Sequence, residues 1–100
     1  MSITYKIKVL WLENSLGIAI DQVNSNVSLQ ITSFYFWPKT DAWEQVKSEL
    51  KSKTWIKERD SILMLNTISE IMNHWQKNRK NQGLEDFKSQ FKNVEFVGAL

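Results

Sequence analysis

The chain has 100 residues, of which 42% are hydrophobic and 24% are charged, with one Pro, no Cys and a formal net charge of +2 at pH 7. This length supports a single domain, residues 1–100, and the composition excludes a disordered chain, a collagen-like repeat and a coiled coil. The lack of cysteine excludes a disulfide framework and a thiol nucleophile, and no apolar run approaches the roughly 20 residues that cross a bilayer.

The first third of the chain predicts β-strands. Apolar residues alternate with polar ones from Ile3 to Trp11, which is the period of a half-buried strand. A turn over 13–17 and a polar break over 24–26 then bound a second strand at Ile18–Val23. A third β-prone run extends from Val27 to Trp37, where Pro38 ends it. Because the strand pattern begins at the N-terminus, we expect no signal or transit peptide.

The apolar period becomes helical after Pro38. Thr40 or Asp41 is a candidate N-cap for a helix over 41–52, and a wide apolar stripe predicts a longer helix over 57–79. A polar loop follows, after which the spacing of Leu84, Phe87 and Phe91 resumes a helical period, and Val94–Val97 is a final short strand or a docked tail. The expected fold class is α+β: a three-stranded antiparallel sheet followed by two helices packed on one face, plus a short C-terminal helix or strand appendage.

Catalytic and metal-binding patterns are weak. His74 follows Glu70 by four residues on the predicted long helix, a spacing that suits an oriented general base. No second catalytic partner lies at a fixed spacing, so we favour a surface histidine beside a helix neighbour. A single histidine, scattered acids and isolated glycines form neither a metal-ligand pattern nor a phosphate loop. We therefore predict that the protein is not an enzyme and takes no cofactor, metal or small-molecule substrate.

Aromatic residues concentrate at the predicted junction between the third strand and the first helix. Residues 34–37 read Phe-Tyr-Phe-Trp, and Trp43 follows them. Such rings stack unpaired bases in some RNA-binding domains, or they fill the corner of a small core, and we favour the core. A partner protein or the C-terminal segment is a candidate cover for the second face of this run. Tyr35, Trp37 and Trp43 are accordingly predicted to be core or partner-contact residues.

Basic residues gather in the second half, where nine Lys or Arg face six acids. The candidates for phosphate contact form three groups: Lys51, Lys53, Lys57 and Arg59; Lys77, Arg79 and Lys80; and Lys88 and Lys92. Glu49, Glu58 and Asp60 are interleaved with the first group, so an ordinary salt-bridged surface is an alternative there, and a cationic helix end explains the second group equally well. Three phosphate contacts would give a salt slope of only about 2–3. Such a chain is a weak binder of free RNA and needs a preformed RNA–protein surface.

Six short motifs are shared with one known family. They are KVLWLE at 8–13, AIDQV at 19–23, YFWP at 35–38, DAWE at 41–44, Leu65-Asn66 and Trp75-Gln76. Together they resemble the plastid-specific ribosomal protein 3 family over about residues 5–97. The resemblance implies a structural constituent of the small ribosomal subunit of plastids or cyanobacteria, without catalysis or a cofactor.

Partners and location also follow from the resemblance. It implies contact with small-subunit rRNA and neighbouring ribosomal proteins, and no membrane. It places the protein in the plastid stroma, or in the cytoplasm of a cyanobacterium. The residues alone leave an alternative open, a protein-interaction module that uses an exposed aromatic surface.

Overall fold

Five strands form one mixed sheet in the computed structural model, which describes residues 3–77, 91 and 94–99. The strands are β1 (Ile3–Trp11), β2 (Leu16–Asn24), β3 (Val27–Gln30), β4 (Tyr35–Trp37) and β5 (Val94–Ala99). Their order is β3-β2-β1-β5, and β4 also pairs with β2. β2 is antiparallel to β1, β3 and β4, whereas β5 is parallel to β1. The α+β class is confirmed, but the predicted three-stranded antiparallel sheet is wrong.

The predicted third strand is interrupted, and this accounts for one of the additional strands. Ile31 still donates its backbone N–H to the carbonyl of Ile20 at 2.9 Å. The Ile20 N–H, however, donates to the Thr32 hydroxyl at 3.0 Å instead of to a backbone carbonyl. Because a side chain replaces the ladder acceptor, the chain leaves the sheet after β3 and returns to β2 as β4.

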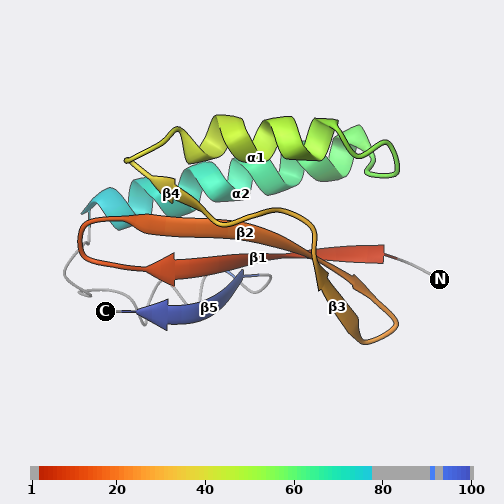
Figure 1. The fold of residues 1–100 in the computed structure, drawn as a ribbon, viewed down its shortest axis with the longest axis horizontal. Coiled ribbons are helices and arrows are strands. Elements are labelled where there is room, and N and C mark those ends of the chain that lie inside the picture. The colour runs from red at the N-terminus through yellow and green to blue at the C-terminus, as the bar shows by residue number, and fades with distance from the viewer. Residues whose placement is uncertain (1–2, 78–90, 92–93, 100) are drawn as a thin grey trace.

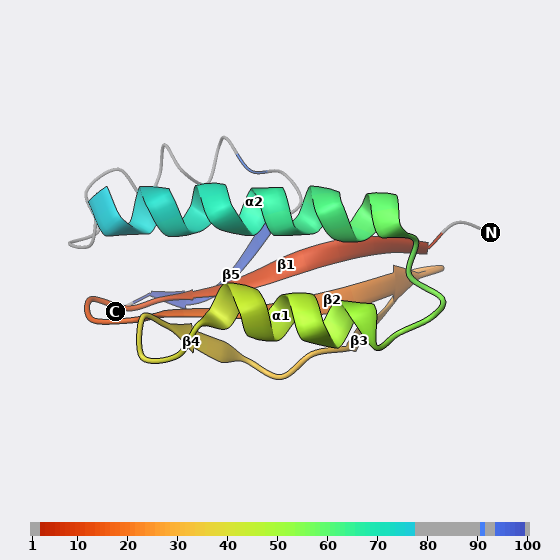
Figure 2. The same ribbon diagram turned by 90° about the horizontal axis from the view of Figure 1, so that it is seen from above.

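Two helices, α1 (Ala42–Lys51) and α2 (Glu58–Lys77), cover the same face of the sheet (Figures 1 and 2). The Asp41 carboxylate caps α1 by accepting the Glu44 backbone N–H at 3.2 Å. Of the two N-cap candidates, Asp41 and not Thr40 therefore has this role. The predicted bounds of 41–52 and 57–79 agree with the two helices, although residues 78 and 79 lie outside the described part of the chain.

The core lies between the helices and alternate residues of the two central strands. Ile7, Val9 and Trp11 stand opposite Ile20, Ile18 and Leu16 in the register of β1 and β2, and all six are at most 3% exposed. The helices contribute Val46, Leu50, Met64, Leu65, Ile68, Ile71, Met72 and Trp75. The sheet is thus apolar on its helix face, as the alternation in β1 predicts.

The C-terminal segment supplies the strand that sequence periodicity left undecided. Val94–Ala99 is β5, and Phe96 packs against the core with its ring centroid 6.2 Å from that of Trp11. The predicted helical segment around Leu84 and Phe87 lies outside the described residues. Phe91 is described and packs partly buried against the core.

Candidate nucleic-acid interface

Three cations are exposed where α1 ends and α2 begins. Lys51 lies in the last turn of α1, Lys57 directly precedes α2, and Arg59 lies in the first turn of α2. None of them forms an ion pair with an acid among the described residues. We call Lys51, Lys57 and Arg59 the loop-end basic cluster. Its charges are available for a phosphate.

Two neighbouring lysines, Lys53 and Lys47, interact with other side chains of this protein instead. The Lys53 ammonium lies 3.5 Å from a carboxylate oxygen of Glu49 and 3.3 Å from its backbone carbonyl oxygen. Lys47 lies 5.3 Å from the ring centroid of Trp43 and 3.9 Å from the Glu44 carboxylate. The residues of the first basic group therefore have two different environments. Lys53 forms a salt bridge with Glu49, whereas the loop-end basic cluster forms none with the residues that the structure describes.

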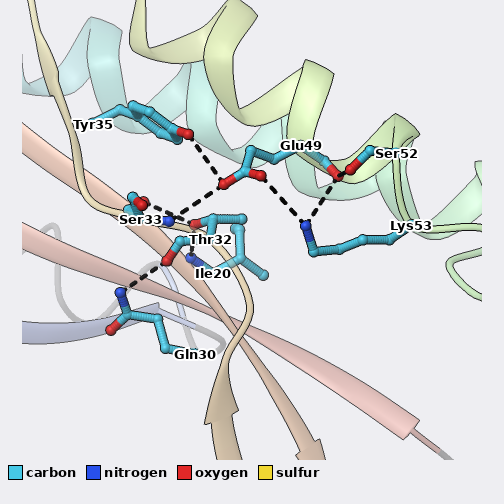
Figure 3. Close-up of polar contacts among 8 residues, drawn as sticks. All are labelled: Ile20, Gln30, Thr32, Ser33, Tyr35, Glu49, Ser52 and Lys53. Carbon is cyan, nitrogen blue, oxygen red and sulfur yellow. Dashed lines mark hydrogen bonds and ion pairs between the residues drawn. The ribbon is translucent and has the colours of Figure 1, made fainter.

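Glu49 connects α1 to the interrupted edge of the sheet (Figure 3). Its carboxylate accepts the Tyr35 hydroxyl at 3.0 Å and the Ser33 backbone N–H at 3.4 Å, on the side opposite Lys53. Ser33 is held in place in turn, because its backbone carbonyl accepts the Thr32 hydroxyl at 3.0 Å. These contacts fix the end of α1, which carries Lys51, relative to the strands.

The ionised form of Glu49 is favoured by its partners. Burial opposes ionisation, but the Tyr35 hydroxyl, the Lys53 charge and the Ser33 N–H outweigh it and hold the pKa of Glu49 below its ordinary value of 4.5. Burial and the nearby Glu49 carboxylate together raise the pKa of Tyr35, so Tyr35 keeps its proton and donates it to the hydrogen bond.

Glu49→Gln should destabilise the fold at pH 7 by about 1–2 kcal/mol, because a charged acceptor of several hydrogen bonds becomes neutral. Since folding lowers the pKa of Glu49, its contribution is complete above 4.5 and is lost as the pH falls through the folded-state value. Urea unfolding at pH 7 and at about pH 3 should give a smaller acid-induced loss for Glu49→Gln than for the wild type. Glu44→Gln is the control, since that side chain is 58% exposed. Equal acid-induced losses in Glu49→Gln and the wild type would contradict this role.

A groove of about 580 Å³ runs between the helices beside the loop-end basic cluster. Leu50, Ile56 and Leu65 contribute apolar side chains to it, and Ile62 is half exposed at its edge. Lys51 is the residue of the loop-end basic cluster that lines the groove, together with Lys47, Lys53 and the acidic Glu58. The surface thus joins cations that suit phosphate to apolar area that suits a protein neighbour.

The predicted aromatic contact residues point toward the core. Tyr35 and Trp37 pair with Ile18 and Leu16 of β2, whose side chains face the helices, and both aromatic residues pack against the core. Trp43 also packs there, and its indole N–H donates to the Leu65 carbonyl at 3.1 Å. The core interpretation of these three residues agrees with their positions.

The other two aromatics of this run, Phe34 and Phe36, have the opposite orientation. Phe36 lies against Gly17, where an added Cβ would come within 2.8 Å of the ring, so a larger residue at position 17 would displace the ring. Phe34 stacks on Phe36 at 6.4 Å, and the Lys8 ammonium lies 5.6 Å from the Phe34 ring centroid. These phenylalanines cover the helix-free face of β2. Sequence reasoning did not single them out, although alternation along the run separates them from Tyr35 and Trp37.

Lys77 is the one residue of the second and third basic groups that the structure describes. Lys77 is exposed at the last position of α2, about 27 Å along the helix axis from Arg59. Arg79, Lys80, Lys88 and Lys92 lie outside the described residues. The helix therefore separates Lys77 from the loop-end basic cluster, and one phosphate cannot bridge them.

The described residues contain few other features that would suit catalysis, metal binding or a membrane. His74 is half-buried on α2 and Glu70 is exposed. Among residues 3–77, 91 and 94–99 there is no cluster of three or more side chains suited to holding a metal ion. No helix in this described part is both long and apolar enough to span a membrane.

Comparison with known proteins supplies the family. Residues 31–78 match the family model for plastid and cyanobacterial ribosomal protein (PSRP-3 / Ycf65). A probable small ribosomal subunit protein cS23 from Synechococcus sp. (strain JA-2-3B'a(2-13)) is 46% identical over 94 residues, which cover 94% of this chain and 95% of the relative. The chain belongs to this family.

Further members of the PSRP-3 / Ycf65 family come from algae. The small ribosomal subunit protein cS23 of Gracilaria tenuistipitata var. liui is 44% identical over 94 residues, covering 94% of this chain and 95% of the relative. That of Euglena viridis is 43% identical over 97 residues, with the same coverage. The resemblance inferred from the sequence motifs is confirmed. The family is one of ribosomal proteins and not of enzymes, which agrees with the prediction.

The part of the chain matched by the PSRP-3 / Ycf65 model contains the features described above. Residues 31–78 run from the interruption of the edge strand through β4 and both helices. They include Glu49 with its partners Ser33, Tyr35 and Lys53, and the loop-end basic cluster.

Proposed function

We propose that this chain is a structural constituent of the small ribosomal subunit of a plastid or cyanobacterium, which supports translation by docking on rRNA and on neighbouring ribosomal proteins. The observation that carries the proposal is the 46% identity over nearly the whole chain to a relative named as a small ribosomal subunit protein. In a plastid its location is the ribosome of the stroma, and in a cyanobacterium that of the cytoplasm.

The loop-end basic cluster is the proposed rRNA contact. Its three side chains are exposed and free of ion pairs among the described residues, and the Glu49 contacts fix the helix end that carries Lys51 to the sheet. Lysine and arginine are the residues that neutralise backbone phosphates, and arginine does so with two parallel hydrogen bonds.

The small number of contacts determines the kind of binding. Each phosphate contact adds about 0.7–0.9 to the salt slope, so three contacts add about 2–3. This is too few for firm capture of free RNA, and the apolar groove beside the cluster supplies the rest of the attachment through a neighbouring protein. The chain therefore docks on a surface that rRNA and protein have already formed.

The other basic candidates belong to a second contact in this proposal. Lys77 begins it at the far end of α2, and Arg79, Lys80, Lys88 and Lys92 continue it along the sequence. Because α2 separates Lys77 from Arg59 by about 27 Å, the two contacts reach different parts of the RNA. Lys53 is less suited to phosphate, since Glu49 already neutralises it.

Three of the aromatic residues on which the alternative of an exposed aromatic module rests do not support it. Tyr35, Trp37 and Trp43 are packed against the core, and two of them use their polar atoms on neighbours within the fold. A partner surface made from these rings would require α1 to leave the sheet.

Combined reversal of Lys51, Lys57 and Arg59 to Glu should weaken binding to small subunits and reduce its salt dependence. The measurement is rebinding to small subunits stripped of this protein by high salt, from a plastid or cyanobacterium that carries a family member. The plot of log binding constant against log salt should lose about 2–3 in slope.

Two single variants provide the matched comparison. Lys57→Glu and Lys39→Glu make the same change of charge at exposed positions, at the cluster and before α1. Only Lys57→Glu should alter the slope. Unchanged binding of the triple variant across the salt series would remove the cluster from the proposal, and failure of the wild-type protein to bind stripped subunits would remove the proposed function itself.

A further inference from the structure

The β2–β3 hairpin has a character opposite to that of the loop-end basic cluster. Between Asp21 and Lys39 the sequence contains no charged residue, in a chain where 24% of residues are charged. Ser25 and Asn26 have positive φ angles of 50° and 70°, which is the two-residue turn that joins antiparallel strands tightly. Figure 1 shows the hairpin turning away from the helices.

The outer edge of β3 offers unpaired backbone groups. β3 is the last strand on its side of the sheet, and no strand of the described residues lies beyond it. In a hairpin closed by the pair Asn24 and Val27, the backbone groups of Val27 and Leu29 point to β2. The Ile31 N–H, two residues further, also bonds to β2. The N–H and C=O groups of Ser28 and Gln30 therefore point outward.

Apolar side chains flank this open edge on the helix side. Val27 is 67% exposed and Leu29 is 61% exposed. Trp55, from the connection between the helices, is 54% exposed, and its indole N–H donates at 2.7 Å to Gln22, the register partner of Leu29. Edge strands of monomeric proteins are normally protected by their shortness, by charged residues, by prolines or by bulges, and β3, although short, has none of the other three.

From this edge we infer that β3 accepts an added strand from a neighbouring protein of the small subunit, an extended uncharged segment whose apolar side chains cover Val27 and Leu29. The inference rests on the proposed function. RNA is a poor occupant because no cation stands on residues 22–38 to meet a phosphate. Backbone pairing gives the affinity and the exposed apolar side chains give the specificity.

A second copy of this chain is a weaker occupant than a subunit neighbour. The edge is four residues long and presents the outward groups of two residues. A few hydrogen bonds and two apolar side chains do not offset the loss of translational and rotational freedom when two free molecules associate. They suffice once the loop-end basic cluster holds the chain on the subunit, because the second contact is then intramolecular.

The test compares Ser28→Pro with Ser28→Ala. Proline removes only an outward N–H and leaves the β2–β3 ladder intact, while alanine keeps that N–H. With salt-stripped small subunits as the probe, Ser28→Pro should bind roughly tenfold more weakly than Ser28→Ala. The salt slope should be the same for both. Leu29→Lys, at a largely exposed side chain, should give a similar loss and serves as the second variant if Ser28→Pro does not fold.

A photo-reactive benzophenone side chain at position 28 identifies the occupant on reconstituted subunits. A cross-link to a ribosomal protein that survives RNase supports the inference. A cross-link to rRNA or to a second copy of this chain, or equal binding of both Ser28 variants and Leu29→Lys, overturns it. Because the wild-type protein is measured in the same series, its failure to bind at all would count against the proposed function.

Discussion

Trp75→Ala should lower the free energy of unfolding by about 3–5 kcal/mol. The indole is fully buried between α2 and the sheet, and its N–H donates to the Leu12 carbonyl at 2.8 Å. Truncation leaves a large cavity and a carbonyl without its donor. Since small domains are stable by only about 5–15 kcal/mol, this single change takes the fold close to its limit.

Urea unfolding followed by circular dichroism measures the effect of Trp75→Ala. Trp55→Ala is the matched control, because Trp55 is 54% exposed and its loss should cost less than about 1 kcal/mol. If Trp75→Ala unfolded at the same urea concentration as Trp55→Ala, Trp75 would not hold α2 to the sheet.

Trp43→Ala should cost about 3 kcal/mol, at the lower end of the range for large aromatic residues because the ring is only partly buried. The ring packs against the core, and its N–H donates to the Leu65 carbonyl of α2. Trp43 thereby ties α1 to α2, and its loss should loosen the groove beside the loop-end basic cluster.

Thermal melting and subunit binding together distinguish the two roles of Trp43. Trp43→Phe keeps one aromatic ring but loses the N–H and the rest of the bicyclic indole, so its stability should fall between that of the wild type and that of Trp43→Ala. Normal melting of Trp43→Ala combined with impaired subunit binding would make Trp43 a contact residue and contradict its core role.

Local periodicity was enough to predict the helices and the central hairpin. The alternation from Ile3 to Trp11 and the helical stripe of α2 both match the buried faces. Local periodicity contains no information on which strands pair with each other, so the parallel pairing of β5 with β1 could not be predicted from it. Nor does periodicity show that the Thr32 hydroxyl replaces a ladder acceptor and divides the third strand.

For a similar reason, the sequence predicted which cations belong to the candidate site but not which contacts they form. The cations from Lys51 to Arg59 were identified by their clustering, but their availability depends on contacts in space. Lys53 is neutralised by Glu49, whereas Lys51 is not, although both lie close to the end of α1. Sequence reasoning named Glu49 only as one of the acids among the first basic group. Its hydrogen bonds with Ser33 and Tyr35 were not predicted, because these partners come from another part of the chain.

The unequal distribution of charge gives the molecule two different docking surfaces. Cations lie at the junction of the helices, and the uncharged strand β3 lies at one edge of the sheet. A protein that meets both RNA and protein on an assembled subunit requires such a division. Neither surface alone is large enough to hold the chain firmly.

A cryo-EM map of the small ribosomal subunit from the source organism tests the central claim most directly. We predict one copy of this fold per subunit, with Lys51, Lys57 and Arg59 within hydrogen-bonding distance of rRNA phosphates. A map in which the chain is missing from the subunit, or in which these three side chains face solvent, would contradict the account.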